Sequence, residues 1–133
     1  MDNEYIKTKT TSSLINYHFV FCPRYRRKIF LDSSVEKRFK ELVYEACKEI
    51  GVKVLAIDCD KDHTHMFLRS LPQLSPSEIM GKIKGRTSRY LRLEFEFLSR
   101  QVSLWTRSFF VSTAGKVSSS TIRNYIESQK KRG

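Results

Sequence analysis

The chain of 133 residues lacks several features that would define other classes of protein. It has only three cysteines, an odd number in apparent core segments, which indicates reduced packing residues and neither a disulfide framework nor a CxxC metal site. No apolar run is long enough for a membrane span, and the N-terminal segment has no signal-peptide core. A GxxxxGK[ST] loop for nucleotide phosphates is also missing. These absences favour a cytoplasmic domain with no membrane partner.

What the chain has in excess is positive charge and aromatic residues. Lys and Arg number 25 against 14 Asp and Glu, which gives a net charge of +11. Such an excess in a short chain predicts a polyanionic partner, most often nucleic acid. Hydrophobic residues make up 40%, with nine Phe and six Tyr, which predicts a packed core. The length fits a single domain over residues 1–133, with residues 1–12 polar and flexible.

Hydrophobic periodicity predicts an α+β domain with the element order β-α-β-β-α-β-α. Ser33 and Glu36 have the spacing of a capping box at the start of the first helix, and Gly51 stands where a left-handed C-terminal residue belongs. Ser75 or Ser77 can cap the second helix. The first six elements match the split-βαβ, ferredoxin-like antiparallel sheet with two helices on one face. The expected strands are 14–22, 52–59, 62–68 and 104–113, and the expected helices are 33–51, 77–93 and 121–132.

The third expected strand carries two of the three histidines, His63 and His65. Side chains alternate along a strand, so both imidazoles project from one face while Thr64 points to the other. Two neighbouring imidazoles can chelate one divalent metal, since histidine is the commonest metal ligand. The spacing alone fits equally well with two polar residues on a solvated sheet face. The third histidine, His18, is expected to be buried and hydrogen-bonded, and we do not assign it to a metal.

Two basic clusters are candidate contacts for a phosphate backbone. The first follows Pro23 at the end of the first strand, and the second occupies one face of the second helix. A charged helix face is more often simply solvated, and that alternative stays open for the second cluster. The candidate nucleic-acid-binding residues are Arg24, Arg26, Arg27, Lys28, Lys82, Lys84, Arg86 and Arg89.

The last expected helix places Tyr125 and Gln129 four residues apart, on one stripe beside the packing positions Ile122 and Ile126. Taken alone, the pair fits ordinary amphipathic decoration. Together with two histidines and a basic chain, it fits another chemistry. Tyr125 can attack a phosphodiester beside a metal held by the histidines, and Gln129 can add an amide oxygen suited to Mg²⁺ or Mn²⁺.

Five blocks in order give the chain a specific resemblance. They are YHFVFCPRYRRKIF at residues 17–30, DHTHMFL at 62–68, KIKGRTSRYLR at 82–92, LWTRSFFVSTAG at 104–115 and IRNYIESQ at 122–129. With them the chain resembles the single-tyrosine HUH transposases of the insertion-sequence 200/605 family over nearly its whole length. One departure is Thr64, where the family's usual motif has a hydrophobic residue. Because that side chain points away from the metal, we expect little consequence.

The resemblance implies a dimeric transposase that binds hairpin ends of an insertion element as single-stranded DNA. It implies that Tyr125 cuts the strand, stays joined to a 5′ phosphate and leaves a free 3′ hydroxyl. His63 and His65 would hold a divalent metal, Mg²⁺ or Mn²⁺, with Gln129 as a further ligand. Residues 116–133 would form a mobile catalytic helix that can complete the histidine site of the partner subunit. The setting implied is a prokaryotic cytoplasm.

Three other interpretations remain open on the sequence alone. A non-catalytic ferredoxin-like nucleic-acid-binding module explains the charge and the aromatic residues, but gives the histidine pair and Tyr125 no joint role. An HUH nicking enzyme of the replication-initiator or relaxase type shares the chemistry, although the length and the whole-chain resemblance favour a transposase. An inactive descendant of an insertion element would keep the same motifs.

Overall fold

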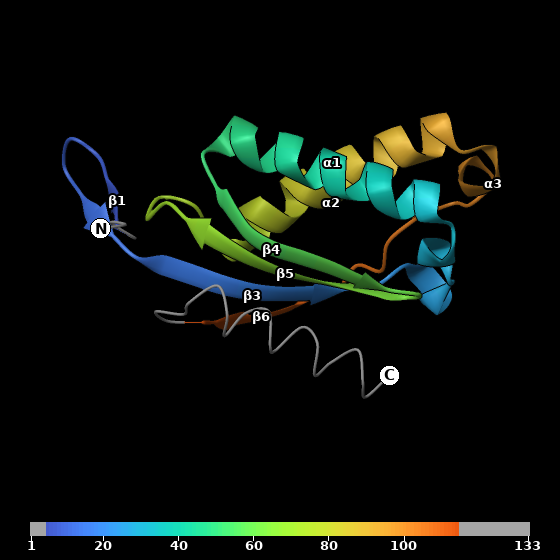
Figure 1. Ribbon diagram of the computed structural model, residues 1–133, viewed down its shortest axis with the longest axis horizontal. Helices are drawn as coiled ribbons and strands as arrows, with labels where there is room; N and C mark the ends of the chain where they lie inside the picture. Colours follow the sequence, from blue (N-terminus) through green and yellow to red (C-terminus); the bar gives the residue numbers. More distant parts are fainter. Residues whose placement is uncertain (1–4, 115–133) are drawn as a thin grey trace.

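A computed structural model describes residues 5–114 as two helices packed on one face of an antiparallel sheet (Figure 1). The strands are β1 (Ile6–Lys7), β2 (Ser12–Ser13), β3 (Ile15–Phe21), β4 (Lys53–Asp60), β5 (His63–Ser70) and β6 (Phe110–Thr113). The helices are α1 (Ser33–Ile50), α2 (Pro76–Glu94) and the short α3 (Glu96–Ser99), with 3-10 turns η1 (Arg24–Arg26) and η2 (Ile29–Leu31). Among these described residues, no helix is long and apolar enough to cross a membrane.

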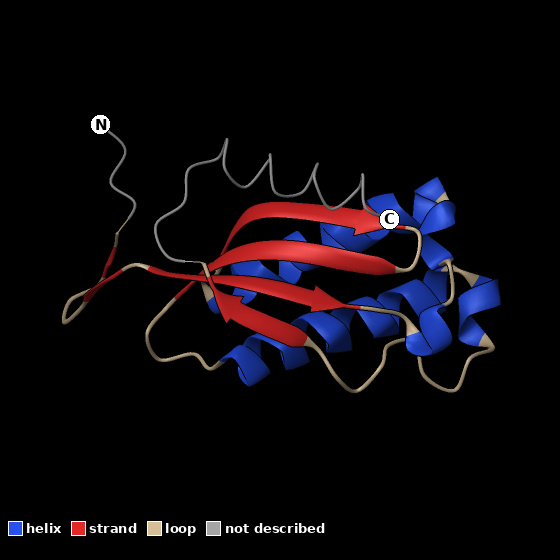
Figure 2. Cartoon of the chain, turned by 90° about the horizontal axis from the view of Figure 1, so that it is seen from below, coloured by secondary structure: helices blue, strands red, loops and turns tan. Residues whose placement is uncertain are grey.

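The main sheet has the strand order β4-β5-β3-β6, with every neighbouring pair antiparallel. Seen from below, the strands lie in front of α1 and α2, which cover only the far face (Figure 2). This order, with two helices on one side, is the ferredoxin-like arrangement, so the predicted α+β fold is confirmed. The added helix expected to carry Tyr125 lies outside the described residues.

Part of the segment expected to be flexible forms a short hairpin, because β1 pairs with β2. The turn is fastened by the Thr8 and Thr11 hydroxyls, which are 2.6 Å apart, and by the Thr11 carbonyl, which accepts from the Thr8 N–H at 2.8 Å. Threonine side chains that bond across a turn stabilise such a hairpin. Residues 1–4 lie outside the described part.

The predicted N-cap of α1 is wrong by one residue. The cap is Asp32, whose Oδ1 accepts from the N–H groups of Ser34 at 2.9 Å and Val35 at 3.4 Å. Aspartate and serine are both good N-caps, and the aspartate also carries a charge that suits a helix N-terminus. The second helix has the capping box at Ser75, where the serine hydroxyl accepts from Glu78 N–H and the Glu78 carboxylate accepts from Ser75 N–H.

The C-terminus of α1 is confirmed at Gly51, which adopts a φ of 78°. A Cβ atom at this position would meet Leu71 Cδ1 at 3.0 Å. Gly51→Ala therefore faces both left-handed backbone strain and a tight contact, and should lower the free energy of unfolding by about 1–2 kcal/mol.

Gly81→Ala is the matched control, since a Cβ there meets nothing within 4 Å inside helix α2. It should raise stability by up to about 1 kcal/mol through helix propensity. Urea denaturation of both variants measures the two changes. Effects of the same sign would contradict the assigned backbone conformations.

The predicted fourth strand, 104–113, is only partly confirmed. Only Phe110–Thr113 pairs with β3, and Trp105 forms an isolated bridge with Pro23. Proline has no N–H and cannot extend a ladder. In addition, the Lys84 ammonium donates to the carbonyls of Thr106 at 2.8 Å and Ser108 at 2.9 Å, which draws this backbone out of the strand.

Aromatic packing fastens this irregular segment to the core. The Trp105 ring meets Phe21 at 4.9 Å and Phe39 at 5.5 Å between centroids, both edge to face. Its indole N–H donates to the Thr87 hydroxyl of α2 at 3.0 Å.

Burial raises the pKa of Cys47 to about 12, so this thiol stays protonated in the core, as expected of a packing residue.

Candidate active site

The histidine pair lies on the sheet face opposite α1 and α2. His63 and His65 have ring centroids 4.9 Å apart, whereas Thr64 between them is fully buried on the helix side. The Thr64 hydroxyl there donates to the Asp58 carbonyl at 3.2 Å. The alternation predicted from the sequence therefore places both imidazoles side by side.

Each histidine is oriented by a partner at its Nδ1 atom. His63 Nδ1 lies 2.9 Å from Asp62 Oδ1, and His65 Nδ1 lies 3.2 Å from His18 Nε2. Arg26 extends the first contact, since its Nε donates to Asp62 Oδ2 at 3.2 Å. Metal-binding histidines characteristically have their second nitrogen held in this way by a carboxylate or another polar group.

His18 is buried and hydrogen-bonded, as expected. Its ring stacks on Phe67 with centroids 4.6 Å apart. Burial, together with His65, lowers the pKa of His18 to about 4. Burial also lowers the pKa of His65, and the neighbouring His63 adds to this effect. Both rings are therefore neutral near pH 7, and neutral imidazole is the form that binds metal.

The carboxyl of Asp62 is ionised in the same network. Burial works to raise its pKa, but the hydrogen bonds from His63 and Arg26 outweigh burial and the net pKa is lowered. An ionised carboxylate accepts from His63 Nδ1 and fixes the tautomer with Nε2 as the coordinating atom. The sequence contained this signal, because Asp62 directly precedes His63, but its role was missed.

The two histidines open into a pocket of about 500 Å³. Its walls come from the end of β3, from β5 and from the irregular segment that Lys84 holds. The lining residues are Val20, Phe21, Cys22, Arg26, His63, His65, Thr106, Ser108, Phe109 and Phe110. Lys84 holds this wall through two hydrogen bonds, and burial lowers the pKa of its ammonium. Its predicted DNA contact stays a prediction.

The donor set fits a divalent metal in part. Two imidazoles oriented at Nδ1 are suitable ligands, but within residues 5–114 no group of three or more His, Cys, Asp and Glu side chains is placed to hold a metal ion. The other predicted site residues, Tyr125 and Gln129, lie outside the described part. The structure thus brings together His63 and His65, and adds His18, Asp62 and Arg26 as their support.

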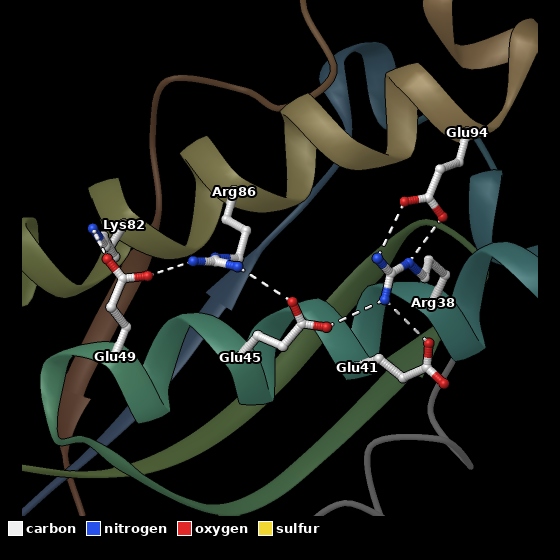
Figure 3. Close-up of polar contacts among 7 residues, drawn as sticks. All are labelled: Arg38, Glu41, Glu45, Glu49, Lys82, Arg86 and Glu94. Atoms are coloured by element: carbon white, nitrogen blue, oxygen red, sulfur yellow. Dashed lines mark hydrogen bonds and ion pairs between the residues drawn. The ribbon is translucent and has the colours of Figure 1, made fainter.

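Two residues of the second basic cluster, Lys82 and Arg86, form ion pairs within the protein (Figure 3). Lys82 bonds Glu49 at 2.7 Å, and Arg86 bonds both Glu45 and Glu49. Arg38 continues the network to Glu41, Glu45 and Glu94. The acidic side chains of α1 therefore offset the positive charges of Lys82 and Arg86. The predicted DNA contacts of these two residues stay untested predictions.

A ferredoxin-like sheet with an oriented histidine pair, in a strongly basic chain, fits enzymes that process DNA. Comparison with known proteins identifies the class as transposases, which are DNA-cleaving enzymes. A family model described as "Transposase IS200 like" matches residues 11–129. The chain belongs to this family.

Individual relatives agree with the family. The chain is 34% identical over 116 residues to the transposase for insertion sequence element IS200 of Salmonella typhimurium, covering 85% of this chain and 75% of the relative, with the same values for Salmonella typhi. It is 25% identical over 118 residues to the ISDra2 transposase TnpA of Deinococcus radiodurans, covering 86% of this chain and 84% of the relative.

Solved structures agree with the fold. A crystal structure described as a transposase from Deinococcus radiodurans superposes with a TM-score of 0.76 at 24% identity, covering 93% of this chain and 97% of that one. A REP-associated tyrosine transposase bound to a REP hairpin gives 0.62 at 13% identity, covering 96% and 67% of the two chains.

Proposed function

We propose that this transposase cuts and rejoins single-stranded DNA at the histidine pocket, with Tyr125 as the nucleophile. The observation that carries the proposal is the histidine pair itself. His63 and His65 project into one pocket, and each is held at Nδ1 by Asp62 or His18. Membership of the IS200-like family supports the same reaction class.

The residues that would hold a divalent metal are His63 and His65 through Nε2, and Gln129 through its amide oxygen. This mixed nitrogen and oxygen set suits Mn²⁺ or Mg²⁺. Bound there, the ion would supply charge stabilisation at the scissile phosphate. Asp62 and His18 would keep the imidazoles oriented, which typically contributes about 10–100-fold in metal affinity.

The tyrosine chemistry balances without an external energy source. The Tyr125 hydroxyl, with an ordinary pKa of about 10, loses its proton as its oxygen attacks the phosphorus. The bond between phosphorus and the 3′ oxygen breaks, which leaves a 3′ hydroxyl and a 5′-phosphotyrosine. Phenolate is a fair leaving group, so an incoming 3′ hydroxyl can reverse the step and join a new strand.

The proposed substrate is a DNA hairpin end of an insertion element, bound as a single strand by a homodimer whose subunits share active sites. The net charge of +11 and the hairpin in the REP-associated relative support this proposal. Arg24, Arg27 and Lys28 are the basic residues proposed to contact the backbone, since they lie in or just after η1, whose Arg26 lines the histidine pocket. Arg89 remains a weaker candidate on α2.

Removal of divalent metal tests the proposal. The wild-type protein is incubated with single-stranded hairpin DNA from the ends of its own element, with Mn²⁺ or with EDTA, and analysed on a denaturing gel. A covalent adduct should form with Mn²⁺ and disappear with EDTA, because the phosphate then lacks its charge stabilisation. Tight hairpin binding without any adduct would instead indicate a non-catalytic binding module. Nicking without joining of two ends would indicate a nickase.

A further inference from the structure

The turn η1 presents an exposed tyrosine in an unusual backbone conformation. Tyr25 is 74% exposed and has a φ of 61°, and the next residue, Arg26, has a φ of 51°. Two consecutive non-glycine residues at positive φ are uncommon and cost free energy, and such strain gathers at functional sites. The contacts around Tyr25 indicate which kind of ligand this exposed ring suits.

A second pocket, of about 600 Å³, lies beside this ring. The guanidinium carbons of Arg24 and Arg27 are each 5.5 Å from the centroid of the Tyr25 ring. The opposite wall follows α3 and is partly apolar, with Phe97 and the 93%-exposed Val102 beside Arg100. An exposed aromatic ring and apolar contacts suit a nucleobase, and three arginines suit the phosphates on either side of it.

The second pocket adjoins the histidine pocket across the bridge between Pro23 and Trp105. On one side of the bridge, Thr106 N–H donates to the Cys22 carbonyl at 3.2 Å, and both residues line the histidine pocket. On the other side, Arg24 N–H donates to the Leu104 carbonyl at 2.9 Å, and Arg24 lines the second pocket. This bridge therefore separates the two pockets, and a DNA strand bound in both would cross it.

Neighbouring residues of η1 divide their side chains between the two pockets. Tyr25 lines the second pocket, whereas Arg26 lines the histidine pocket and donates to Asp62, the partner of His63. The positive φ values at both residues allow this division within a three-residue turn. The turn η1 thus connects the second pocket with Asp62, the carboxylate that orients the candidate metal ligand His63.

We propose that the second pocket, beside Tyr25, binds the base of one unpaired nucleotide, a few nucleotides from the phosphodiester cut at the histidine pocket. Tyr25 stacks on the base, Phe97 and Val102 close the apolar side, and the arginines contact the adjoining phosphates. The pocket thereby sets which phosphate of the strand enters the active site. This inference rests on the proposed function only for its substrate, single-stranded DNA.

A fluorescence experiment tests the pocket without requiring cleavage. Hairpin DNA from the element's ends, with its single-stranded flanks, carries 2-aminopurine at one flank position at a time and is titrated with protein in EDTA. Wild type and Tyr25→Phe, which keeps the ring, should quench one position most strongly. Tyr25→Asn removes the ring and still tolerates positive φ. It should lose that quenching and bind roughly 5- to 100-fold more weakly, the usual range for one stacked base.

Tyr44→Ala is the matched control, because Tyr44 is a 54%-exposed tyrosine of α1 that lines neither pocket. It should bind and quench as wild type does. Equal affinity and quenching in Tyr25→Asn and wild type, with equal melting temperatures, would overturn the proposal. Absence of DNA binding by the wild-type protein would also overturn the proposal. An acidic protein segment would then be the better occupant of the second pocket.

The pocket and the proposed function can fail separately. Position-specific quenching that depends on Tyr25, without any metal-dependent adduct, would uphold the pocket and reject cleavage. An adduct that forms normally, with DNA affinity and quenching unaffected by Tyr25→Asn, would uphold cleavage and reject the pocket.

Discussion

Tyr125→Phe should abolish the covalent protein–DNA adduct while hairpin binding stays within about twofold of wild type. The change removes one oxygen atom, the proposed nucleophile, and keeps the ring. Loss of a covalent nucleophile typically lowers the rate by ~10⁴-fold or more, so neither adduct nor free cleaved strand should be detectable on a gel. A denaturing gel with end-labelled DNA measures the adduct, and a native gel in EDTA measures binding.

Tyr44→Phe is the control, since it removes the same atom from an exposed tyrosine of α1 and should leave the adduct unchanged. An adduct that persisted in Tyr125→Phe would place the nucleophile on another residue. Mass spectrometry of the digested adduct would then identify that residue. The transposase family assignment would stand in that case, and only the assigned nucleophile would change.

His63→Ala and His65→Ala should each abolish cleavage by removing one of two imidazoles from the proposed metal site. Their effects on stability should differ. His63 is partly exposed, and its alanine variant should melt close to wild type. His65 is buried and shares a hydrogen bond with His18, so His65→Ala should lower the free energy of unfolding by about 1–3 kcal/mol.

Calorimetric titration with Mn²⁺ and a thermal melt separate these two effects. Loss of Mn²⁺ binding in a folded His63→Ala protein would support a metal ligand. Retained Mn²⁺ affinity and retained cleavage in that variant would reject the metal site. Loss of folded protein in both variants would mean that the histidines serve the core and not the chemistry.

The sequence was sufficient for the topology because its signals were local. Alternation along residues 62–68 placed His63 and His65 on one face, and the strand and helix order predicted the sheet. The first part of the strand predicted at 104–113 is absent for a tertiary reason, since Lys84 of α2 holds that segment. Hydrophobic periodicity in the sequence does not show a hydrogen bond from a side chain 22 residues away.

The support of the site was less accessible to sequence analysis. His18 reaches His65 because of the register in which His18 opposes Phe67 and Val20 opposes His65, which makes the two histidines diagonal neighbours. That register is a property of the assembled sheet. The sequence does not indicate the positive φ of Tyr25, because glycine and asparagine are the usual residues at such positions and neither is present there.

The ion-pair network between α1 and α2 has a consequence for how the protein meets DNA. The network of Figure 3 joins three basic and four acidic side chains, so the outer helical layer nearly cancels its own charge over these residues. A polyanion approaching from that side gains little attraction there. Encounters that begin near η1, where Arg24 and Arg27 stand beside an exposed ring, are favoured instead. We expect this uneven charge to orient the protein, before contact forms, with η1 toward the DNA.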